Sequence, residues 1–273
     1  MTGTILTPPL VLRTERMIAS KQGAIGWIVF NNPARRNAVS LEMWEALGEI
    51  VDDYARDPAI RVIVARGAGG KAFVSGADIS EFEQKRATPE DTEAYRQISE
   101  RATSALQYVG KPTIAMIEGF CVGGGVSVAL SCDLRIAGAS ARFAVPAAKL
   151  GLGYELPGVR KLMQVVGPAF TKEIFYTGRQ FDAQEALGMG LINRAVPDAE
   201  LESYVATYAE TIAANAPLTV ASIKTIVHEA LKDESERSEA LCDEVVDRCF
   251  NSEDYVEGRR AFMEKRKPAF RGR

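Results

Sequence analysis

The amino-acid sequence predicts an α/β fold in which strands alternate with helices, followed by an all-helical C-terminal part. Short apolar, β-rich runs alternate with segments of helical apolar spacing as far as about residue 196. Beyond that point, three helical patterns follow one another with no strand between them. A chain of 273 residues, 47% of them hydrophobic, is long enough to bury a sizeable core.

The elements of the first part are expected in a regular order. Strands are indicated by apolar runs that end in Asn, Pro or Gly, and helices by apolar residues that recur every three or four positions. The expected elements are a strand over 24–33, a helix from Ser40 to the Asp57-Pro58 stop, a strand over 60–67, a helix over 89–109, a strand over 111–119, and a strand over 133–138.

The C-terminal helical patterns span 199–216, 217–233 and 238–250, and Pro217 and a polar stretch over 233–238 separate them. Their apolar stripes are broad enough to dock on the α/β body or on a neighbouring subunit. We therefore expect two parts, an α/β body over 1–196 and a helical region over 197–273.

Composition and charge narrow the function classes. The formal net charge of −3 gives no basic footprint for nucleic acid, and the short cluster KRKPAFRGR is typical of a solvated tail. The four cysteines form no CxxC pair, which favours reduced core residues and an intracellular protein. No apolar run reaches membrane-spanning length and the N-terminus lacks a signal-peptide layout, so we expect a cytoplasmic protein without membrane partners.

Two glycine-containing turns are the main candidates for chemistry. Gly123–Gly125 stand between a strand and an apolar helix, where each helical glycine costs about 0.5–1 kcal/mol relative to alanine. The second turn, Gly76-Ala77-Asp78, also follows a strand. Small residues at both turns would let the backbone N–H groups of Ala77 and Gly124 approach one oxygen atom, as an oxyanion hole requires. Close packing of the helix against the sheet is the alternative reading of the glycines.

Several segments taken together resemble the crotonase superfamily, that is, the enoyl-CoA hydratase/isomerase family. The resemblance covers residues 20–270 and depends on five motifs in the same order. They are NNPARRNAVS (31–40), KAFVSGADI (71–79), IEGFCVGGGVSVALSCDLRIA (117–137), TGRQFDAQEALGMGLINRAV (177–196) and NSEDYVEGRRAFMEKRKPAF (251–270).

The resemblance implies a crotonase-like spiral of ββα units with a C-terminal helical trimerisation region, assembled as a homotrimer or a dimer of trimers. It also implies an acyl-CoA thioester as substrate, with coenzyme A as part of that substrate and no separate cofactor. The N–H groups of Ala77 and Gly124 would hold the thioester oxygen as it becomes an enolate.

The same resemblance implies a coenzyme A site along the loops from Arg35 to Ala38 and from Ala77 to Ile79. Asp78 is also expected to shape its own turn by holding nearby N–H groups. Lys265 matches a position that approaches the coenzyme A phosphate, often from the neighbouring subunit. The expected coenzyme A contacts are Arg35, Ala38, Phe73, Asp78, Ile79 and Lys265.

The acid residues of hydratases in this family are missing from the chain. By resemblance, hydratases carry one glutamate three residues after the middle glycine and another after the proline of an FGxPE-like stretch. Ser127 and Ala147 occupy those two positions here. A serine without a neighbouring base does not replace a carboxylic acid near neutral pH. Two-glutamate hydration is therefore not expected.

Glu155 is the predicted acid–base residue, because it matches the single catalytic carboxylate of some isomerases in the family. Shifting a double bond needs one group that removes a proton at C2 and returns one at C4. We expect the neighbouring Tyr154, Leu156 and Pro157 to desolvate this carboxylate partly and to raise its pKa. The chain departs from those isomerases where Leu156-Pro157 replaces glycines after the acid.

Two alternatives remain open. Tyr154 and the C-terminal tail resemble methylmalonyl-CoA decarboxylases of the family, although these carry histidine where this chain has Ala77 and Glu155 would repel a substrate carboxylate. A silent acyl-CoA-binding protein would keep the fold without the chemistry. The single histidine, His228, is expected to pack rather than react, and no metal site or GxSxG elbow is expected.

Overall fold

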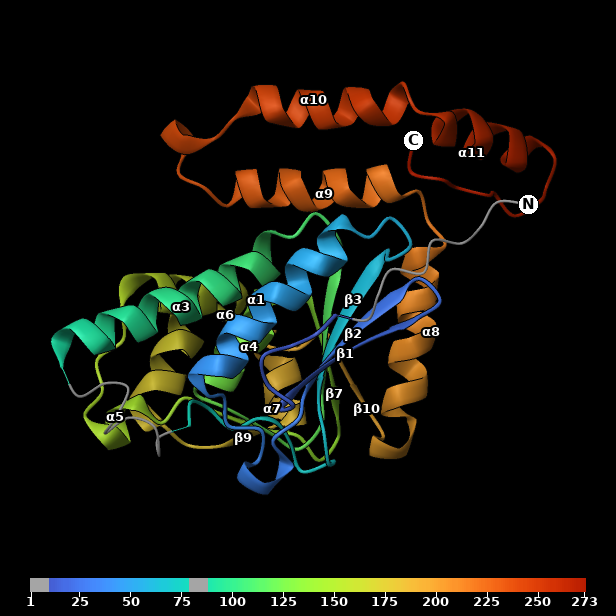
Figure 1. Ribbon diagram of the computed structural model, residues 1–273. Coiled ribbons are helices and arrows are strands. Elements are labelled where there is room, and N and C mark those ends of the chain that lie inside the picture. Colours follow the sequence, from blue (N-terminus) through green and yellow to red (C-terminus); the bar gives the residue numbers. More distant parts are fainter. Residues whose placement is uncertain (1–9, 79–87) are drawn as a thin grey trace.

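The computed structural model describes residues 10–78 and 88–273 and shows two β-sheets enclosed by helices (Figure 1). The predicted α/β fold is confirmed. The larger sheet has the order β1-β2-β3-β5-β7-β10, in which only the β1–β2 pair is antiparallel. Its strands are β1 (Met17–Gln22), β2 (Ile25–Phe30), β3 (Val62–Gly67), β5 (Thr113–Ile117), β7 (Leu134–Gly138) and β10 (Arg194–Val196).

The smaller sheet has the order β4-β6-β8-β9, and its last pair is antiparallel. Its strands are β4 (Ala72–Val74), β6 (Phe120–Val122), β8 (Arg142–Ala144) and β9 (Phe181–Asp182). In three successive units, a strand of the larger sheet is followed by a short strand of the smaller one and then by helix. This arrangement is the expected spiral of ββα units. Strands of three residues are too short to show an apolar period, so the sequence did not predict them.

The helices of the body pack against both sheets. Helix α1 (Leu41–Arg56) begins at Ser40, whose hydroxyl accepts a hydrogen bond from the Met43 N–H. It lies beside α3 (Pro89–Tyr108), which starts at the capping residue Thr88. The remaining helices of the body are α4 (Gly124–Ser131), α5 (Ala147–Leu150), α6 (Leu156–Thr177) and α7 (Ala183–Gly188), with the short 3-10 helix η1 (Pro33–Arg35) before α1.

Helix α8 (Leu201–Ala213) covers the opposite face of the larger sheet (Figure 1). Its side chains Leu201, Val205 and Ala209 are buried with the outward-facing residues of the central strands. The first of the C-terminal helical patterns therefore packs on the α/β body. A separate C-terminal region over 197–273 stays a prediction.

Those later helices are α9 (Pro217–Ala230), α10 (Glu239–Phe250) and α11 (Glu253–Met263). Figure 1 shows α9 and α10 lying side by side across one end of the body, with α11 beyond them. They leave large apolar side chains exposed, including Phe250, Phe262 and Met263, around a groove of about 780 Å³. Within the two described ranges, no helix is long and apolar enough to cross a membrane.

Candidate functional site

The three glycines of the turn before α4 meet different requirements. Gly123 has φ +53°, a conformation that side chains other than glycine rarely adopt. A Cβ atom on Gly125 would lie 2.0 Å from the carbonyl oxygen of Val74, so this glycine lets α4 pack directly on β4. Gly124 is the first residue of the helix, where a backbone N–H has no partner inside the helix. Packing therefore explains Gly125, while Gly124 presents a donor.

The turn at Ala77 is held so that the Ala77 N–H points away from the neighbouring segment at Val39. The Val39 N–H donates to the Gly76 oxygen and the Asp78 N–H donates to the Val39 oxygen, each at 2.9 Å. In this parallel bridge Ala77 itself makes no bond to Val39, so its N–H projects from the other edge. That edge faces Gly124, because a Cβ atom on Gly124 would lie 3.5 Å from the Ala77 nitrogen.

The two turns thus bring the backbone nitrogens of Ala77 and Gly124 close together. Among the described residues, neither N–H donates to a protein acceptor. Two unpaired backbone donors at a helix start can hold an oxygen that gains negative charge. The structure brings together the two donors that the sequence singled out.

Asn37 holds the loop next to this pair of turns. Its backbone has φ +57°, and its side chain is fully buried. The Nδ2 atom donates to the carbonyl oxygens of Ala68 and Ala72, at 3.0 and 2.7 Å, and the Oδ1 atom accepts from the Asn32 N–H at 2.9 Å. This amide therefore ties the loop over 31–38 to β4 and its turn. The sequence analysis included Asn37 in a motif but gave it no role.

The expected coenzyme A residues on this loop lie where a ligand can reach them. Arg35 is exposed and its Nη1 atom lies 3.3 Å from Oδ1 of Asp78, which is buried. Ala38 is half-buried on the same loop. Phe73 was expected to contact the ligand, and this is wrong for its side chain, which is fully buried against Phe30. Ile79 lies outside the described residues.

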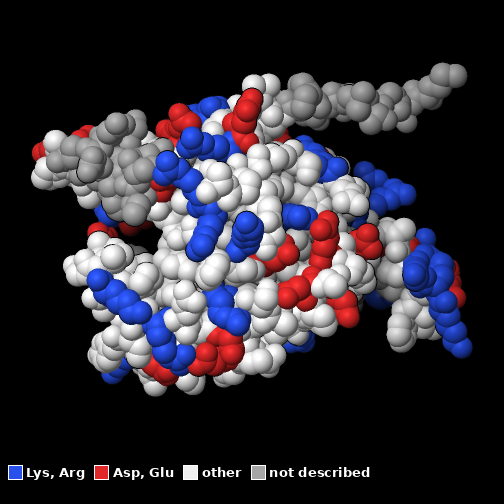
Figure 2. All heavy atoms as spheres, turned by 90° about the horizontal axis from the view of Figure 1, so that it is seen from below, with Lys and Arg blue, Asp and Glu red and all other residues white. Residues whose placement is uncertain are grey.

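Lys265 is not brought to these turns within one chain. It follows α11, and Figure 1 shows α11 at the opposite end of the molecule from α5. A phosphate contact from a neighbouring subunit stays a prediction. Figure 2 shows that Lys and Arg on the face seen from below stand in several separate groups, with Asp and Glu between them. This face therefore carries both charge signs side by side.

A cavity of about 970 Å³ extends from the start of α4 towards the C-terminal helices. Gly123 and Ser127 line it, so the predicted turn opens directly into this space. Ser127 stands where hydratases would carry an acid, and Ala147, at the second such position, is buried in α5. Among the described residues, the carboxylates that line the cavity are Glu100, Glu155 and Glu236.

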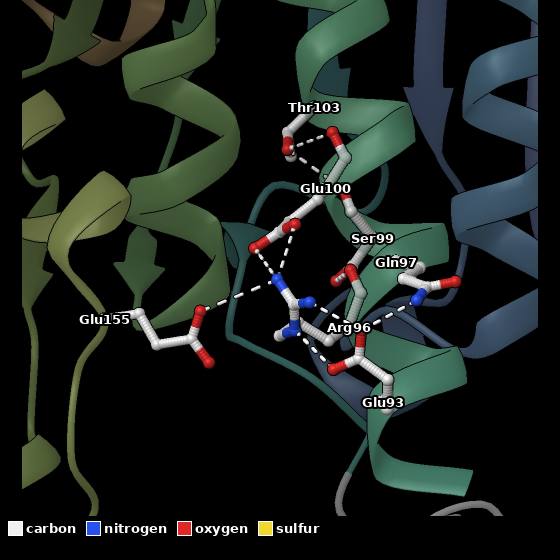
Figure 3. Close-up of polar contacts among 7 residues, drawn as sticks. All are labelled: Glu93, Arg96, Gln97, Ser99, Glu100, Thr103 and Glu155. Atoms are coloured by element: carbon white, nitrogen blue, oxygen red, sulfur yellow. Dashed lines mark hydrogen bonds and ion pairs between the residues drawn. The ribbon is translucent and has the colours of Figure 1, made fainter. Parts of the chain in front are cut away.

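Glu155 lines the cavity as the residue that precedes α6. Its carboxylate points towards α3, where the Arg96 Nη1 atom lies 3.6 Å from Oε2 (Figure 3). Arg96 is itself held by Glu93 and Glu100. The expected desolvation of Glu155 is not found in the single chain, because its side chain is 63% exposed. The neighbours Tyr154 and Leu156 are also exposed and do not cover the carboxylate.

Tyr154 lines the same cavity. Its ring packs edge-to-face on Phe175, with the centroids 4.8 Å apart. The residue keeps 39% of its surface exposed, yet desolvation around the hydroxyl raises its pKa above the ordinary value. The phenol therefore remains protonated at neutral pH and can donate a hydrogen bond or a proton.

The far end of the cavity contains residues that the sequence analysis did not assign to the site. His228 lines it and packs edge-to-face on Tyr108 at 5.1 Å, with its pKa lowered by burial. Lys161 on α6 and Arg96 on α3 also line the cavity. Each cation looks like an ordinary surface residue of an amphipathic helix, so the sequence alone offered no signal for them. Within the described ranges, no group of three or more His, Cys, Asp or Glu could hold a metal.

Comparison with known proteins gives concordant matches over nearly the whole chain. Residues 20–273 match the family model described as enoyl-CoA hydratase/isomerase. The short-chain-enoyl-CoA hydratase of Clostridium acetobutylicum is 30% identical over 94% of this chain and 97% of its own. The carnitinyl-CoA dehydratase of Proteus mirabilis is 34% identical over 95% of this chain and 100% of its own.

Solved structures agree with these matches. The crystal structure of an enoyl-CoA hydratase/carnithine racemase from Magnetospirillum magneticum superimposes with a TM-score of 0.91 and 39% identity, over 95% of this chain and 97% of that one. A putative enoyl-CoA hydratase/isomerase family protein from Hyphomonas neptunium gives a TM-score of 0.89, also at 39% identity. Both TM-scores show that the fold is shared over nearly the whole chain.

Proposed function

Because this chain belongs to the enoyl-CoA hydratase/isomerase family, whose members act on acyl-CoA thioesters, we propose that it shifts the double bond of an enoyl-CoA. The N–H groups of Ala77 and Gly124 hold the thioester oxygen, and Glu155 moves the proton. The proximity of these two unpaired N–H donors, next to Gly123 and the cavity that Glu155 also lines, is the observation that supports this proposal.

The proposed reaction conserves atoms and charge. The Glu155 carboxylate removes a proton from C2 of a 3-enoyl-CoA, and the electron pair passes into the thioester to form a dienolate. The two N–H groups stabilise the negative oxygen as it forms. The protonated Glu155 then returns a proton to C4, which leaves the 2-enoyl-CoA and the original carboxylate. A carboxylate that is mobile enough to reach both carbons suits this exchange, and Glu155 lies in a loop end rather than inside a helix.

Hydration is less well supported, although several relatives are named as hydratases or dehydratases. A water that adds across the double bond needs an acid and a base beside it. Ser127 lines the cavity where one of them would stand, and Ala147 is buried at the position of the other. Of the carboxylates that line the cavity, Glu155 is the nearest in sequence to Ala147.

The test is a comparison of Glu155→Gln with Glu236→Gln, because Glu236 lines the same cavity at its far end. Isomerisation of a 3-enoyl-CoA is measured for both variants. Loss of a general acid–base group lowers kcat by about 10²–10⁴-fold, so Glu155→Gln should fall by at least about a hundredfold. The Glu236→Gln control should stay within about twofold. The proposal would be contradicted if the protein hydrates 2-enoyl-CoA rapidly and its Glu155→Gln variant keeps full activity.

Decarboxylation of a 2-carboxyacyl-CoA is the second candidate, supported by the protonated phenol of Tyr154 in the cavity. Loss of carbon dioxide gives the same enolate without a base, and Tyr154 would then donate a proton to C2. Arg96, 3.6 Å from Glu155, lessens the repulsion that this carboxylate exerts on an anionic substrate. Methylmalonyl-CoA turnover that Tyr154→Phe abolishes and Glu155→Gln preserves would favour this candidate. A protein that binds acyl-CoA and turns over none of these substrates would instead be a silent family member.

We also propose that the chain assembles into a homotrimer or a dimer of trimers. The exposed apolar side chains of α10 and α11, such as Phe250, Phe262 and Met263, support this assembly. A neighbouring chain would also be needed to bring Lys265 to a coenzyme A phosphate. Light scattering of the purified protein tests the mass, and a monomer at micromolar concentration would contradict the assembly.

A further inference from the structure

Lys161 lies on α6 and lines the cavity. It contacts α4 at Ser131, one helical turn after Ser127. Its Nζ atom donates to the hydroxyl oxygen of Ser131 at 3.1 Å. The Ser131 hydroxyl in turn donates to the carbonyl oxygen of Ser127 at 2.9 Å, and Ser131 is buried. The ammonium group is therefore fixed against α4, on the same side of that helix as the lining residue Ser127.

The other cations that line the cavity are neutralised by carboxylates. Arg96 pairs with Glu100 at 2.8 Å, Arg160 with Asp233 at 3.4 Å, and Lys232 with Glu229 at 2.6 Å. Among the lining residues that the structure describes, Lys161 is the cation without an ion pair within 4.0 Å.

This ammonium group is also poorly satisfied. It has three N–H donors and one of them has a protein acceptor, the Ser131 hydroxyl. Lys161 is half-buried, and this burial lowers the pKa of its ammonium group. Glu100 is close enough to oppose that shift, but both of its carboxylate oxygens are bonded to Arg96. A partly desolvated cation with free donors is complementary to an anionic oxygen.

We propose that Lys161 determines substrate specificity by binding a carboxylate at the far end of the acyl chain. This inference rests on the proposed function only in that the acyl group of a thioester held at Gly124 enters this cavity. A substrate that ends in a methyl group would leave the ammonium without a partner. A substrate that ends in a carboxylate would complete its hydrogen bonds.

The geometry sets the length and character of this acyl chain. Gly124 and Ser131 are the first and last residues of α4. At a rise of about 1.5 Å per residue, the thioester and the terminal carboxylate of the acyl chain would therefore lie roughly 10 Å apart. An extended chain of about eight bonds covers that distance. Val126, Leu130 and Leu162 line the cavity as well, so methylene groups would pass apolar side chains before they reach Lys161.

The experiment measures binding of unreactive saturated thioesters, so that it does not depend on turnover. Calorimetry compares two acyl-CoA ligands of about eight carbons, one with a terminal methyl and one with a terminal carboxylate, on the full-length protein. A charge-assisted hydrogen bond in a desolvated site favours the carboxylate ligand by about ten- to a hundredfold. Lys161→Gln should abolish this preference, and Lys161→Arg should retain most of it. Lys172→Gln, an exposed lysine of the same helix, should behave as wild type.

The outcomes separate this inference from the proposed function. A wild-type protein that binds the methyl-terminated ligand as well as the carboxylate, or a preference that Lys161→Gln leaves unchanged, overturns the inference. A Lys161-dependent preference in a protein that isomerises no 3-enoyl-CoA supports the inference and contradicts the proposed reaction. If Lys161→Gln fails to fold, the wild-type preference and its retention in Lys161→Arg still decide the question, because loss of the preference on that substitution overturns the inference.

Discussion

Replacing Gly124 with alanine would separate the catalytic use of the glycine turn from its use in packing. Gly124 has no positive φ, so alanine fits its backbone. The added methyl carbon would lie 3.5 Å from the Ala77 nitrogen, which is an ordinary van der Waals contact. The same methyl would stand near the N–H that we propose receives the thioester oxygen. The substitution should therefore leave the fold intact and crowd the proposed oxyanion hole.

The magnitudes follow from these contacts. An oxyanion needs about 2.7–3.1 Å to each donor, and removal of one such donor lowers kcat by about 10²–10³-fold. We expect a loss of that size for Gly124→Ala. Because a compatible Gly→Ala change stabilises a fold by about 0.4–1 kcal/mol, the melting temperature should stay the same or rise slightly.

Gly125→Ala is the matched control, since it adds the same methyl one residue further along α4. There the methyl would lie 2.0 Å from the Val74 carbonyl oxygen, so α4 and β4 must move apart by more than an ångström. Overpacking of this kind costs about 1–3 kcal/mol. We expect Gly125→Ala to lower the melting temperature by roughly 2–4 °C per kcal/mol.

The assay pairs steady-state isomerisation of a 3-enoyl-CoA with thermal unfolding of the same samples. A Gly124→Ala protein with wild-type kcat would refute the assignment of its N–H as an oxyanion donor. A Gly124→Ala protein as unstable as Gly125→Ala would show that both glycines serve packing.

Two further predictions concern the support of the site and of the core. Asn37→Ala leaves the oxygens of the half-buried Ala68 and the buried Ala72 without this donor, so it should cost about 2–4 kcal/mol and raise KM for acyl-CoA. An unchanged denaturant midpoint would contradict this. The buried Tyr54 hydroxyl lies 2.9 Å from the Ser20 and Trp27 oxygens, and burial raises its pKa. Its stabilisation is therefore complete below the unfolded pKa of about 10 and is lost as the pH rises towards the folded pKa. Above about pH 10, wild type should lose stability with pH more steeply than Tyr54→Phe in urea titrations.

Local patterns in the sequence predicted several of the long elements and the two turns, although they did not predict α6. The strand over 60–67 corresponds to β3 and the helix from Ser40 corresponds to α1, because each has a clear period and a stop signal. Glycine and alanine at the ends of strands pointed to backbone donors, because small side chains leave N–H groups accessible. These features depend on neighbouring residues, which a sequence displays directly.

The tertiary structure decided the properties that depend on residues far apart in the chain. The Ala77 N–H faces Gly124 because the bridge to Val39 uses the other edge of the turn. Glu155 meets Arg96 and remains exposed, contrary to the desolvation expected from its neighbours in sequence. Lys161 meets Ser131 across two helices, and no local pattern distinguishes it from a solvated lysine. Burial and charge pairing arise from packing between elements, so the sequence could point to the two turns, while the environment of the charged groups near them could not be predicted from it.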